Sequence, residues 1–283
     1  MKNPDPCHVL VEDLHDTVAM ELKKNHLQDL KPTLAILCFG TNPLSEVHIS
    51  QKIKSCDKFG IKVIVDRFSV DASEDTAVEW VNRMSTDPMV HGILTQMPLP
   101  DQISNSRLFL EINPQKDVDG LNPINVGQIF YHSEAFKPAV VEAIIRLIRK
   151  LQVSLKGKNV VIVGSSSLIS LPLSLYLQAN LATLTVCNEY SQEKENLTSN
   201  ADILIAAAGS PHLIKKDWVK QGAIVIDVGI SETETGKIIS DVDYDDVRTV
   251  ADYITPSPGG IGPLTVSCLL LNILRAVNNF GNE

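Results

Sequence analysis

The segment Thr33–Gly40, TLAILCFG, decides the fold class of this chain. It is short, apolar and closed by a glycine, which is typical of a strand buried on both faces of a parallel sheet. Asn42 and Pro43 follow almost at once, and they predict an N-cap and a proline at the first position of a helix that runs to about Phe59. A buried strand that leads directly into a helix begins a β–α–β unit and predicts the α/β class.

The same alternation continues on both sides of Pro138. Apolar patterns predict strands at 61–69, 90–96, 159–164, 182–187, 202–207 and 223–229, and helices at 74–85, at 140–151 and up to residue 178. Repeated strand–helix units favour mainly parallel sheets, so we expect two α/β domains, 1–138 and 139–263. The second series begins with NVVIVG at 159–164, and it predicts a Rossmann-like, doubly wound parallel sheet that binds a dinucleotide.

Composition narrows the class of partner. The net charge is −9 and 44% of the residues are hydrophobic, as in an ordinary acidic globular protein. The sequence has no long basic block and no aromatic residues interleaved with Lys or Arg, which argues against nucleic acid as a partner. An acidic chain does not steer an anionic substrate over long range, so local cations must hold any such ligand.

The five cysteines are scattered and odd in number, which predicts neither a disulfide framework nor a metal site. We expect them to be small buried side chains in a reducing compartment. Residues 1–14 lack the apolar run of a signal peptide, and we expect no stretch that approaches the ~20 apolar residues of a membrane span. These features predict a cytoplasmic protein without a membrane partner.

Three segments of the first domain carry candidate chemistry: NPLSEVHISQKIKSC at 42–56, GILTQMPLP at 92–100 and KDVDG at 116–120. His48 and Lys52 are four residues apart and share one face of the expected helix. Gln96 comes at the carboxyl end of a strand and Asp119 in a loop, where ligands of open α/β sheets bind. Taken singly, Lys52 also fits a solvated surface cation, Gln96 a strand cap and Asp119 a turn residue.

Taken together, these segments resemble the bifunctional methylenetetrahydrofolate dehydrogenase/cyclohydrolase family over nearly the whole chain. The family has a Tyr-x-x-x-Lys helix, a motif similar to GILVQLPLP and a third similar to KDVDGF-P-N-G. Near the C-terminus, PSPGGIGPLT at 256–265 is similar to the family's PVPGGVGPMT, and DVGI at 227–230 to its DVGIN. The resemblance implies a homodimeric enzyme of folate one-carbon metabolism and purine biosynthesis, with a cleft between the domains. It also implies that a C-terminal helix, 264–283, returns to the first domain.

The resemblance implies oxidation of methylenetetrahydrofolate to methenyltetrahydrofolate and its hydrolysis to formyltetrahydrofolate. Lys52 would act as a general base or proton shuttle, Gln96 would hold Lys52 by a hydrogen bond, and Asp119 would accept hydrogen bonds from the pterin. Lys52 must be partly neutral near pH 7 for this role, and burial or a neighbouring cation can lower its pKa. Folate contacts are further implied at His48, Pro98, Leu99, Pro258, Gly259, Gly260, Gly262 and Pro263.

The implied cofactor residues are Gly164, Ser165, Ser166, Ser170, Glu189, Gly209, Gly229 and Ile230. The family's first turn resembles GASNIVGRP, whereas GSSSLISLP stands at 164–172, so that Ser170 replaces a glycine and Leu171 replaces an arginine. The family's PCTPxG segment has become PAVVEA at 138–143. The carboxylate of Glu189 can accept a hydrogen bond from a ribose 2′-hydroxyl but repels a 2′-phosphate. NADP, NAD and no cofactor all remain open, and the cyclohydrolase step is better supported than the NADP-dependent step.

His48 stands where the family usually has Tyr. If His48 were protonated, it would lower the pKa of Lys52 and make the site pH-sensitive near neutrality. The alternative is a polar substitution without functional effect. Two other interpretations remain. One is a non-catalytic folate-binding or regulatory relative that has lost dinucleotide binding. The other is a dehydrogenase of the shikimate type, against which the segments at 92–100 and 258–265 argue.

Overall fold

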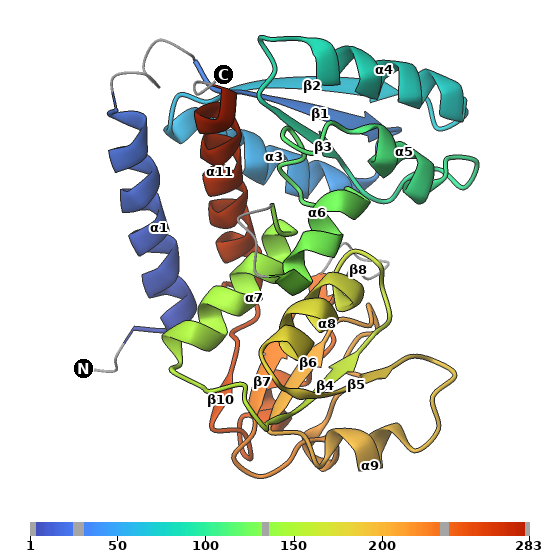
Figure 1. Cartoon of the computed structure of the whole chain (residues 1–283). Helices are drawn as coiled ribbons and strands as arrows, with labels where there is room; N and C mark the ends of the chain where they lie inside the picture. The colour runs from blue at the N-terminus through green and yellow to red at the C-terminus, as the bar shows by residue number, and fades with distance from the viewer. Residues whose placement is uncertain (1–3, 25–30, 132–135, 233–237, 281–283) are drawn as a thin grey trace. The chain divides into compact units, whose positions relative to one another are not determined.

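The computed structural model describes residues 4–24, 31–131, 136–232 and 238–280. It divides into two compact units. The first unit contains the described residues of 11–128, 134–139 and 266–283, and the second contains those of 1–10, 129–133 and 140–265. Figure 1 labels most helices and strands of both units. The boundary between the main segments of the two units lies between Ala139 and Val140. Residues 4–10 and 129–131, which the sequence places in the first domain, belong to the second unit.

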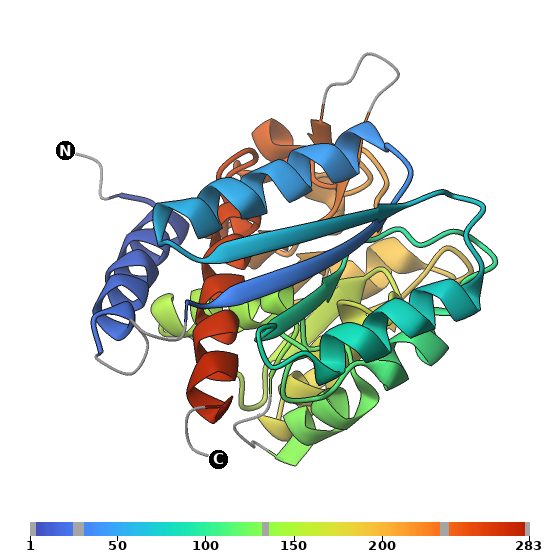
Figure 2. The same ribbon diagram turned by 90° about the horizontal axis from the view of Figure 1, so that it is seen from above.

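The first unit is built on a three-stranded parallel sheet in the order β2-β1-β3. Its elements are β1 (Thr33–Phe39), α3 (Pro43–Lys58), β2 (Lys62–Phe68), α4 (Glu74–Thr86), β3 (Gly92–Thr95), α5 (Asn105–Glu111) and α6 (Pro123–Gln128), with most of α1 (Pro6–Leu22) and α11 (Ile261–Phe280). All seven residues of β1 are buried, because it is the central strand and both of its faces are covered. Figures 1 and 2 show α3 and α4 on opposite faces of the sheet.

The start of α3 follows the predicted chemistry. The side chain of Asn42 accepts a hydrogen bond from the backbone N–H of Ser45 at 3.1 Å, and Pro43 begins the helix. The N-cap therefore fixes the point at which the chain leaves β1. Because the helix begins there, Lys52 lies on its third turn.

The second unit has a five-stranded parallel sheet in the order β10-β7-β6-β4-β5. Its elements are the 3₁₀ turn η1 (Ile129–Tyr131), α7 (Ala139–Lys150), β4 (Asn159–Val163), α8 (Ser170–Ala179), β5 (Thr183–Cys187), α9 (Lys194–Thr198), β6 (Ile203–Ala206), the 3₁₀ turn η2 (Lys216–Trp218), β7 (Ile224–Asp227), the hairpin β8 (Ile230–Glu232) and β9 (Ile238–Ser240), α10 (Tyr244–Val247) and β10 (Tyr253–Ile254). β5 lies on one side of β4, and β6, β7 and β10 lie on the other side. The direction in which strands are added therefore reverses between β4 and β6. Such reversal points bind ligands at the carboxyl ends of the strands.

The predicted α/β class and doubly wound second domain are confirmed. Each predicted strand and helix occurs within a few residues of its expected bounds. Of the predicted C-terminal helix 264–283, residues 281–283 lie outside the described residues. The observed helix begins earlier, at Ile261. Asn272 on this helix donates hydrogen bonds to the carbonyl groups of Val118 and Lys137, which ties residues 266–280 to the first unit.

The expectation about membrane-length segments was wrong for α11. Residues Ile261–Asn279 have a mean hydropathy of 1.4 and are long enough to cross a membrane by length and composition alone. However, 61% of that window is buried inside the protein, with Leu264, Leu270 and Ile273 fully buried. A helix that is apolar on nearly every side because it is enclosed is typical of a protein core, and α11 has this role here.

Candidate functional site

Lys52 and Gln96 meet in the first unit, although 44 residues separate them in the sequence. Nζ of Lys52 donates a hydrogen bond to Oε1 of Gln96 at 2.9 Å. The amide nitrogen of Gln96 donates to the carbonyl oxygen of Met97 at 2.9 Å, and this second bond fixes which end of the amide faces the lysine. Gln96 directly follows β3 and is 8% exposed. The amide is therefore a firmly placed acceptor for the ammonium group.

Asp119 lies in the loop of residues 116–120, which forms a parallel bridge to β3 through Asp117 and Ile93. Asp117 shapes this loop: its carboxylate accepts hydrogen bonds from the N–H groups of Leu121 at 3.1 Å and Asn122 at 2.8 Å. Burial raises the pKa of Asp117 to about 6. The first carboxylate of the KDVDG motif thus organises the loop, and the role of Asp119 toward a ligand stays a prediction.

Lys52 and Asp119 each oppose the effect of burial on the other's pKa. Burial lowers the pKa of Lys52 from its ordinary value of 10.5, and the charge of Asp119 opposes that shift only in part. Burial also raises the pKa of Asp119, with Lys52 opposing it. A lysine whose charged form is destabilised has a larger neutral fraction near pH 7, which a base needs. The predicted direction for Lys52 is confirmed, and burial is its cause.

The hypothesis that a protonated His48 lowers the pKa of Lys52 needs correction. Burial and the positive charge of Lys52 both lower the pKa of His48 from 6.5, so the imidazole is mostly neutral near pH 7. The electrostatic influence at neutrality therefore runs from Lys52 to His48. His48 gains its charge only in acid, below its already lowered pKa.

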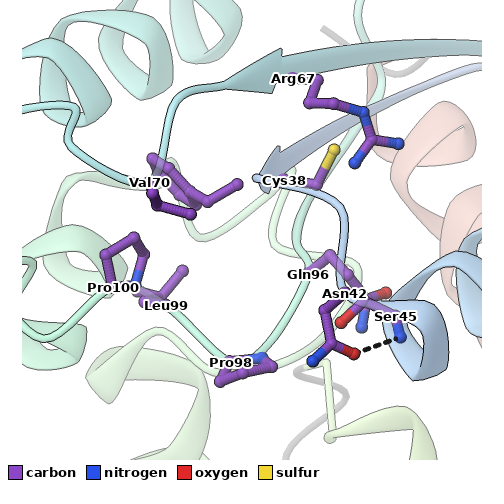
Figure 3. A pocket seen from close by; sticks show the side chains of 10 residues that line it. Cys38, Asn42, Ser45, Arg67, Val70, Gln96, Pro98, Leu99 and Pro100 are labelled. Atoms are coloured by element: carbon purple, nitrogen blue, oxygen red, sulfur yellow. Dashed lines mark hydrogen bonds between the residues drawn. The ribbon is translucent and has the colours of Figure 1, made fainter.

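A pocket of about 220 Å³ lies beside Gln96 in the first unit (Figure 3). It is lined by Cys38, Phe39, Asn42, Ser45, Arg67, Val70, Gln96, Pro98, Leu99 and Pro100. The predicted folate contacts Pro98 and Leu99 form part of its wall. Figure 3 shows Val70, Leu99 and Pro100 facing one another on one side, with Asn42 and Ser45 on the other.

The predicted contacts at 258–263 belong to the second unit. Gly259 has a φ of +105°, which favours glycine. A Cβ at Gly260 would lie 2.5 Å from the carbonyl oxygen of Pro256, so the protein's own backbone excludes a side chain there. The roles of Pro258, Gly262 and Pro263 toward a ligand stay predictions.

The predicted cofactor residues follow four strands of the second sheet at one edge. Gly164, Ser165 and Ser166 follow β4, Glu189 follows β5, Gly209 follows β6, and Gly229 and Ile230 follow β7. Because all four strands are parallel, their carboxyl ends lie at the same edge of the sheet. The turns after β4 and β6 flank the point of reversal, where a dinucleotide would be expected.

Gly164 is required by close contact inside this edge. Its φ is +120°, and a Cβ there would lie 2.1 Å from the carbonyl oxygen of Ala207. Ser170 is 2% exposed, and its hydroxyl donates to the carbonyl oxygen of Gly164 at 2.8 Å. The serine that replaces the family's glycine at position 170 therefore closes the turn from inside through its hydroxyl. Ser166 closes the same turn by accepting from the N–H of Leu168 at 3.0 Å.

Asp241 contacts two of the other predicted glycines. Its buried carboxylate accepts from the N–H groups of Ala208 at 2.6 Å, Gly209 at 3.0 Å and Ser210 at 2.7 Å. A Cβ at Gly229 would lie 1.8 Å from an oxygen of the same carboxylate. Gly229 therefore leaves room for a side chain of the protein itself, whereas a Cβ at Gly209 would meet no atom and glycine is favoured there by its φ of +66°.

Three residues of these sites were not predicted. Asp241 and Asp117 gave no signal, because their acceptors are backbone groups that only the fold brings together. Arg67 did carry a signal, since it is a cation at the carboxyl end of a predicted strand, and the acidic composition required local cations. Among the described residues, no group of three or more His, Cys, Asp or Glu side chains is arranged to hold a metal ion.

Comparisons with known proteins agree with this arrangement. The description "Tetrahydrofolate dehydrogenase/cyclohydrolase, catalytic domain" matches residues 7–119, and its "NAD(P)-binding domain" counterpart matches residues 138–280. The bifunctional protein FolD of Anoxybacillus flavithermus is 40% identical over 267 residues, which cover 94% of each chain.

Solved structures give the same result. The bifunctional FolD enzyme of Campylobacter jejuni superposes with a TM-score of 0.91 at 34% identity, over 97% of this chain and 98% of that one. The Trypanosoma brucei dehydrogenase-cyclohydrolase, solved with NADP and an inhibitor, has a TM-score of 0.88 at 30% identity, over 96% and 95%. These matches exclude the shikimate-type interpretation. The predicted family is confirmed: the chain belongs to the tetrahydrofolate dehydrogenase/cyclohydrolase family, and residues 138–280 are its NAD(P)-binding domain.

Proposed function

We propose that this chain oxidises methylenetetrahydrofolate to methenyltetrahydrofolate and hydrolyses the product to formyltetrahydrofolate. One observation carries the proposal: Lys52, with a pKa lowered by burial, is held by Gln96 at 2.9 Å in the same unit as Asp119. Members of the family to which the chain belongs are named as bifunctional enzymes of these two steps. No observation on the described residues favours the non-catalytic alternative.

In the hydrolytic step, Lys52 acts as the base. Its neutral amine accepts a proton from water while the water oxygen bonds to the cationic methenyl carbon of the folate. Collapse of this adduct forms the formyl C=O and breaks one carbon–nitrogen bond. The lysine returns its proton to the departing nitrogen, and the hydroxyl proton is released to solvent. Gln96 orients the amine, and Asp119 accepts hydrogen bonds from the amino-pyrimidine edge of the pterin.

In the oxidative step, a bound nicotinamide dinucleotide supplies the hydride acceptor. The second unit fits such a group, because the turns after β4 and β6 flank the reversal point of its sheet and Gly164 lets the two turns meet. Residues 164–166 would lie against the pyrophosphate through their backbone N–H groups.

We further propose that Glu189 weakens NADP relative to NAD. Its side chain is exposed after β5, where a carboxylate accepts from a ribose 2′-hydroxyl and repels a 2′-phosphate. Calorimetric titration with each dinucleotide tests this. Glu189→Ser should bind NADP more tightly and NAD less tightly than the wild type, and unchanged affinities for both would refute the proposal.

A homodimer formed through the second unit is also proposed. β5 is an edge strand of its sheet, and exposed apolar side chains lie on and beside it, with Val186 40% and Leu181 63% exposed. Light scattering should give twice the chain mass, and Val186→Lys should lower it. We also propose a cytoplasmic location, because all five cysteines are buried free thiols.

The direct test of the proposed function is turnover. Purified protein should oxidise methylenetetrahydrofolate with a dinucleotide and hydrolyse methenyltetrahydrofolate faster than buffer does. Hydrolysis without oxidation would limit the function to a cyclohydrolase. Folate binding without either reaction would instead establish the non-catalytic alternative.

A further inference from the structure

The pocket beside Gln96 has apolar walls and a single cationic side chain. Val70, Leu99 and the two prolines Pro98 and Pro100 provide apolar surface, and Val70 is 55% exposed although it is apolar. Arg67 is the one charged side chain among the described residues that line the pocket. Its volume of about 220 Å³ is smaller than the ~300–1,000 Å³ of sites that enclose a whole drug-sized ligand. The pocket therefore suits one part of a larger ligand.

Arg67 is placed at this pocket by the sheet. It lies near the carboxyl end of β2 and pairs in register with Cys38 of β1. Its guanidinium donates to the carbonyl oxygen of Gly40 and forms a 2.6 Å ion pair with Glu46 on the first turn of α3. The side chains of Arg67 and Glu46 are 34% and 42% exposed. The cation is therefore fixed in direction but still open to solvent, with a partner that a second carboxylate can replace.

Gln96 connects this pocket to the reacting end of the site, since it lines the pocket and also binds Lys52. A ligand that reaches from Lys52 into the pocket would carry an apolar planar portion along the valine, leucine and proline walls. It would end in an anion at Arg67. The tail of a folate has this chemistry, because an aromatic ring is joined through an amide to a glutamate with free carboxylates.

Resting on the proposed function, we propose that the pocket binds the p-aminobenzoylglutamate part of the folate and that Arg67 pairs with a carboxylate of its glutamate. Glu46 competes for the same guanidinium. Arg67 is thus a specificity residue that favours glutamylated folates over folates without a glutamate. Arg67 thus provides the local positive charge that an acidic protein needs in order to bind an anionic substrate.

The test compares two ligands by calorimetry: tetrahydrofolate and tetrahydropteroate, which lacks the glutamate. In Arg67→Gln, the dissociation constant for tetrahydrofolate should rise by about 3- to 10-fold, the range expected for a partly exposed ion pair, while that for tetrahydropteroate stays the same. Glu46→Gln should tighten tetrahydrofolate alone, because it removes the competitor. Arg83→Gln is the matched control, since Arg83 is 66% exposed, faces Asp66 and does not line the pocket.

The outcomes separate this inference from the proposed function. Equal changes for both ligands in Arg67→Gln, or no change for either, would overturn the role of Arg67 even if the wild type turns over folate. A selective loss for tetrahydrofolate would support that role even if the wild type proved inactive. Failure of the wild type to bind tetrahydrofolate at all would overturn both.

Discussion

Replacement of Lys52 separates its role as a base from its role as a charge. Lys52→Met removes both the charge and the proton-accepting nitrogen. Lys52→Arg keeps a positive charge, but a guanidinium does not lose its proton in proteins. If Lys52 acts as a base, hydrolysis of methenyltetrahydrofolate should be lost in both variants. If it acts only as a cation, the arginine variant should keep most of the rate.

The size of the effect follows from the site. A positioned base contributes about 10²- to 10⁴-fold to a rate, which corresponds to about 3–5 kcal/mol of barrier. Gln96 would remain in both variants, but its amide cannot accept the proton that the lysine accepts. The whole of this contribution should therefore be lost. Lys52→Met should not unfold the protein, because burial destabilises the charged form of Lys52 in the folded state, as its lowered pKa indicates. Lys52→Arg keeps a charge that the site disfavours, so its thermal unfolding is measured beside its rate.

The assay is the hydrolysis rate above the buffer rate as a function of pH, followed by the loss of methenyltetrahydrofolate absorbance. The wild-type rate should rise with pH until the lowered pKa of Lys52 is passed, because only the neutral amine is active. Lys54→Met is the matched control, since Lys54 is an exposed lysine on the same helix. A Lys52→Arg variant that retains at least one tenth of the wild-type rate would refute the role of Lys52 as a base.

Three further predictions concern other parts of the chain. Gly164→Ala should lower the free energy of unfolding by about 3 kcal/mol or more, because its Cβ would meet a carbonyl oxygen at 2.1 Å. Gly157 has a φ of +75° but no atom near the position of a Cβ, so Gly157→Ala should lower the free energy of unfolding by only about 1 kcal/mol. Equal losses in chemical denaturation would contradict the effect of close contact at Gly164. His48→Tyr should remove only the part of the acid-side loss of hydrolysis that comes from charging of His48 below its lowered pKa, while the part that comes from protonation of Lys52 stays. A pH–rate profile identical to that of the wild type would exclude this role of His48. Burial raises the pKa of Asp227 to about 7, so the folded state binds the proton more tightly than the unfolded chain does, and stability should fall as pH rises from about 4 to 7. Asp227→Asn should reduce this fall by up to about 4 kcal/mol, and an unchanged pH dependence of thermal unfolding would count against it.

The sequence predicts the strands well because their signal is local. β1 and β4 are apolar runs of strand length with turn residues beside them, and α3 has its cap and its proline in adjacent positions. α1 was not predicted, although Leu10, Leu14 and Val18 are buried at four-residue spacing, so its signal was readable. Short elements such as α10 offer too few residues for a period to appear.

Contacts between distant segments could not be derived from spacing. The sequence placed Lys52 on a helix and Gln96 at a strand end, but the 2.9 Å bond between them depends on how α3 packs against the sheet. Asp117 and Asp119 are two residues apart and look alike in sequence. Only the fold shows that the backbone N–H groups of Leu121 and Asn122 bind the first of them.

The carboxylate of Asp241 acts as a permanent internal ligand. Three successive backbone N–H groups form a concave donor set of the kind that elsewhere captures free anions, and here that set is filled before any cofactor arrives. The loop after β6 therefore has little conformational entropy left to lose when a dinucleotide binds. The same donors are no longer available to a phosphate. The predicted pyrophosphate contacts that stay available are those of the turn after β4, where the sequence of this chain departs most from its family.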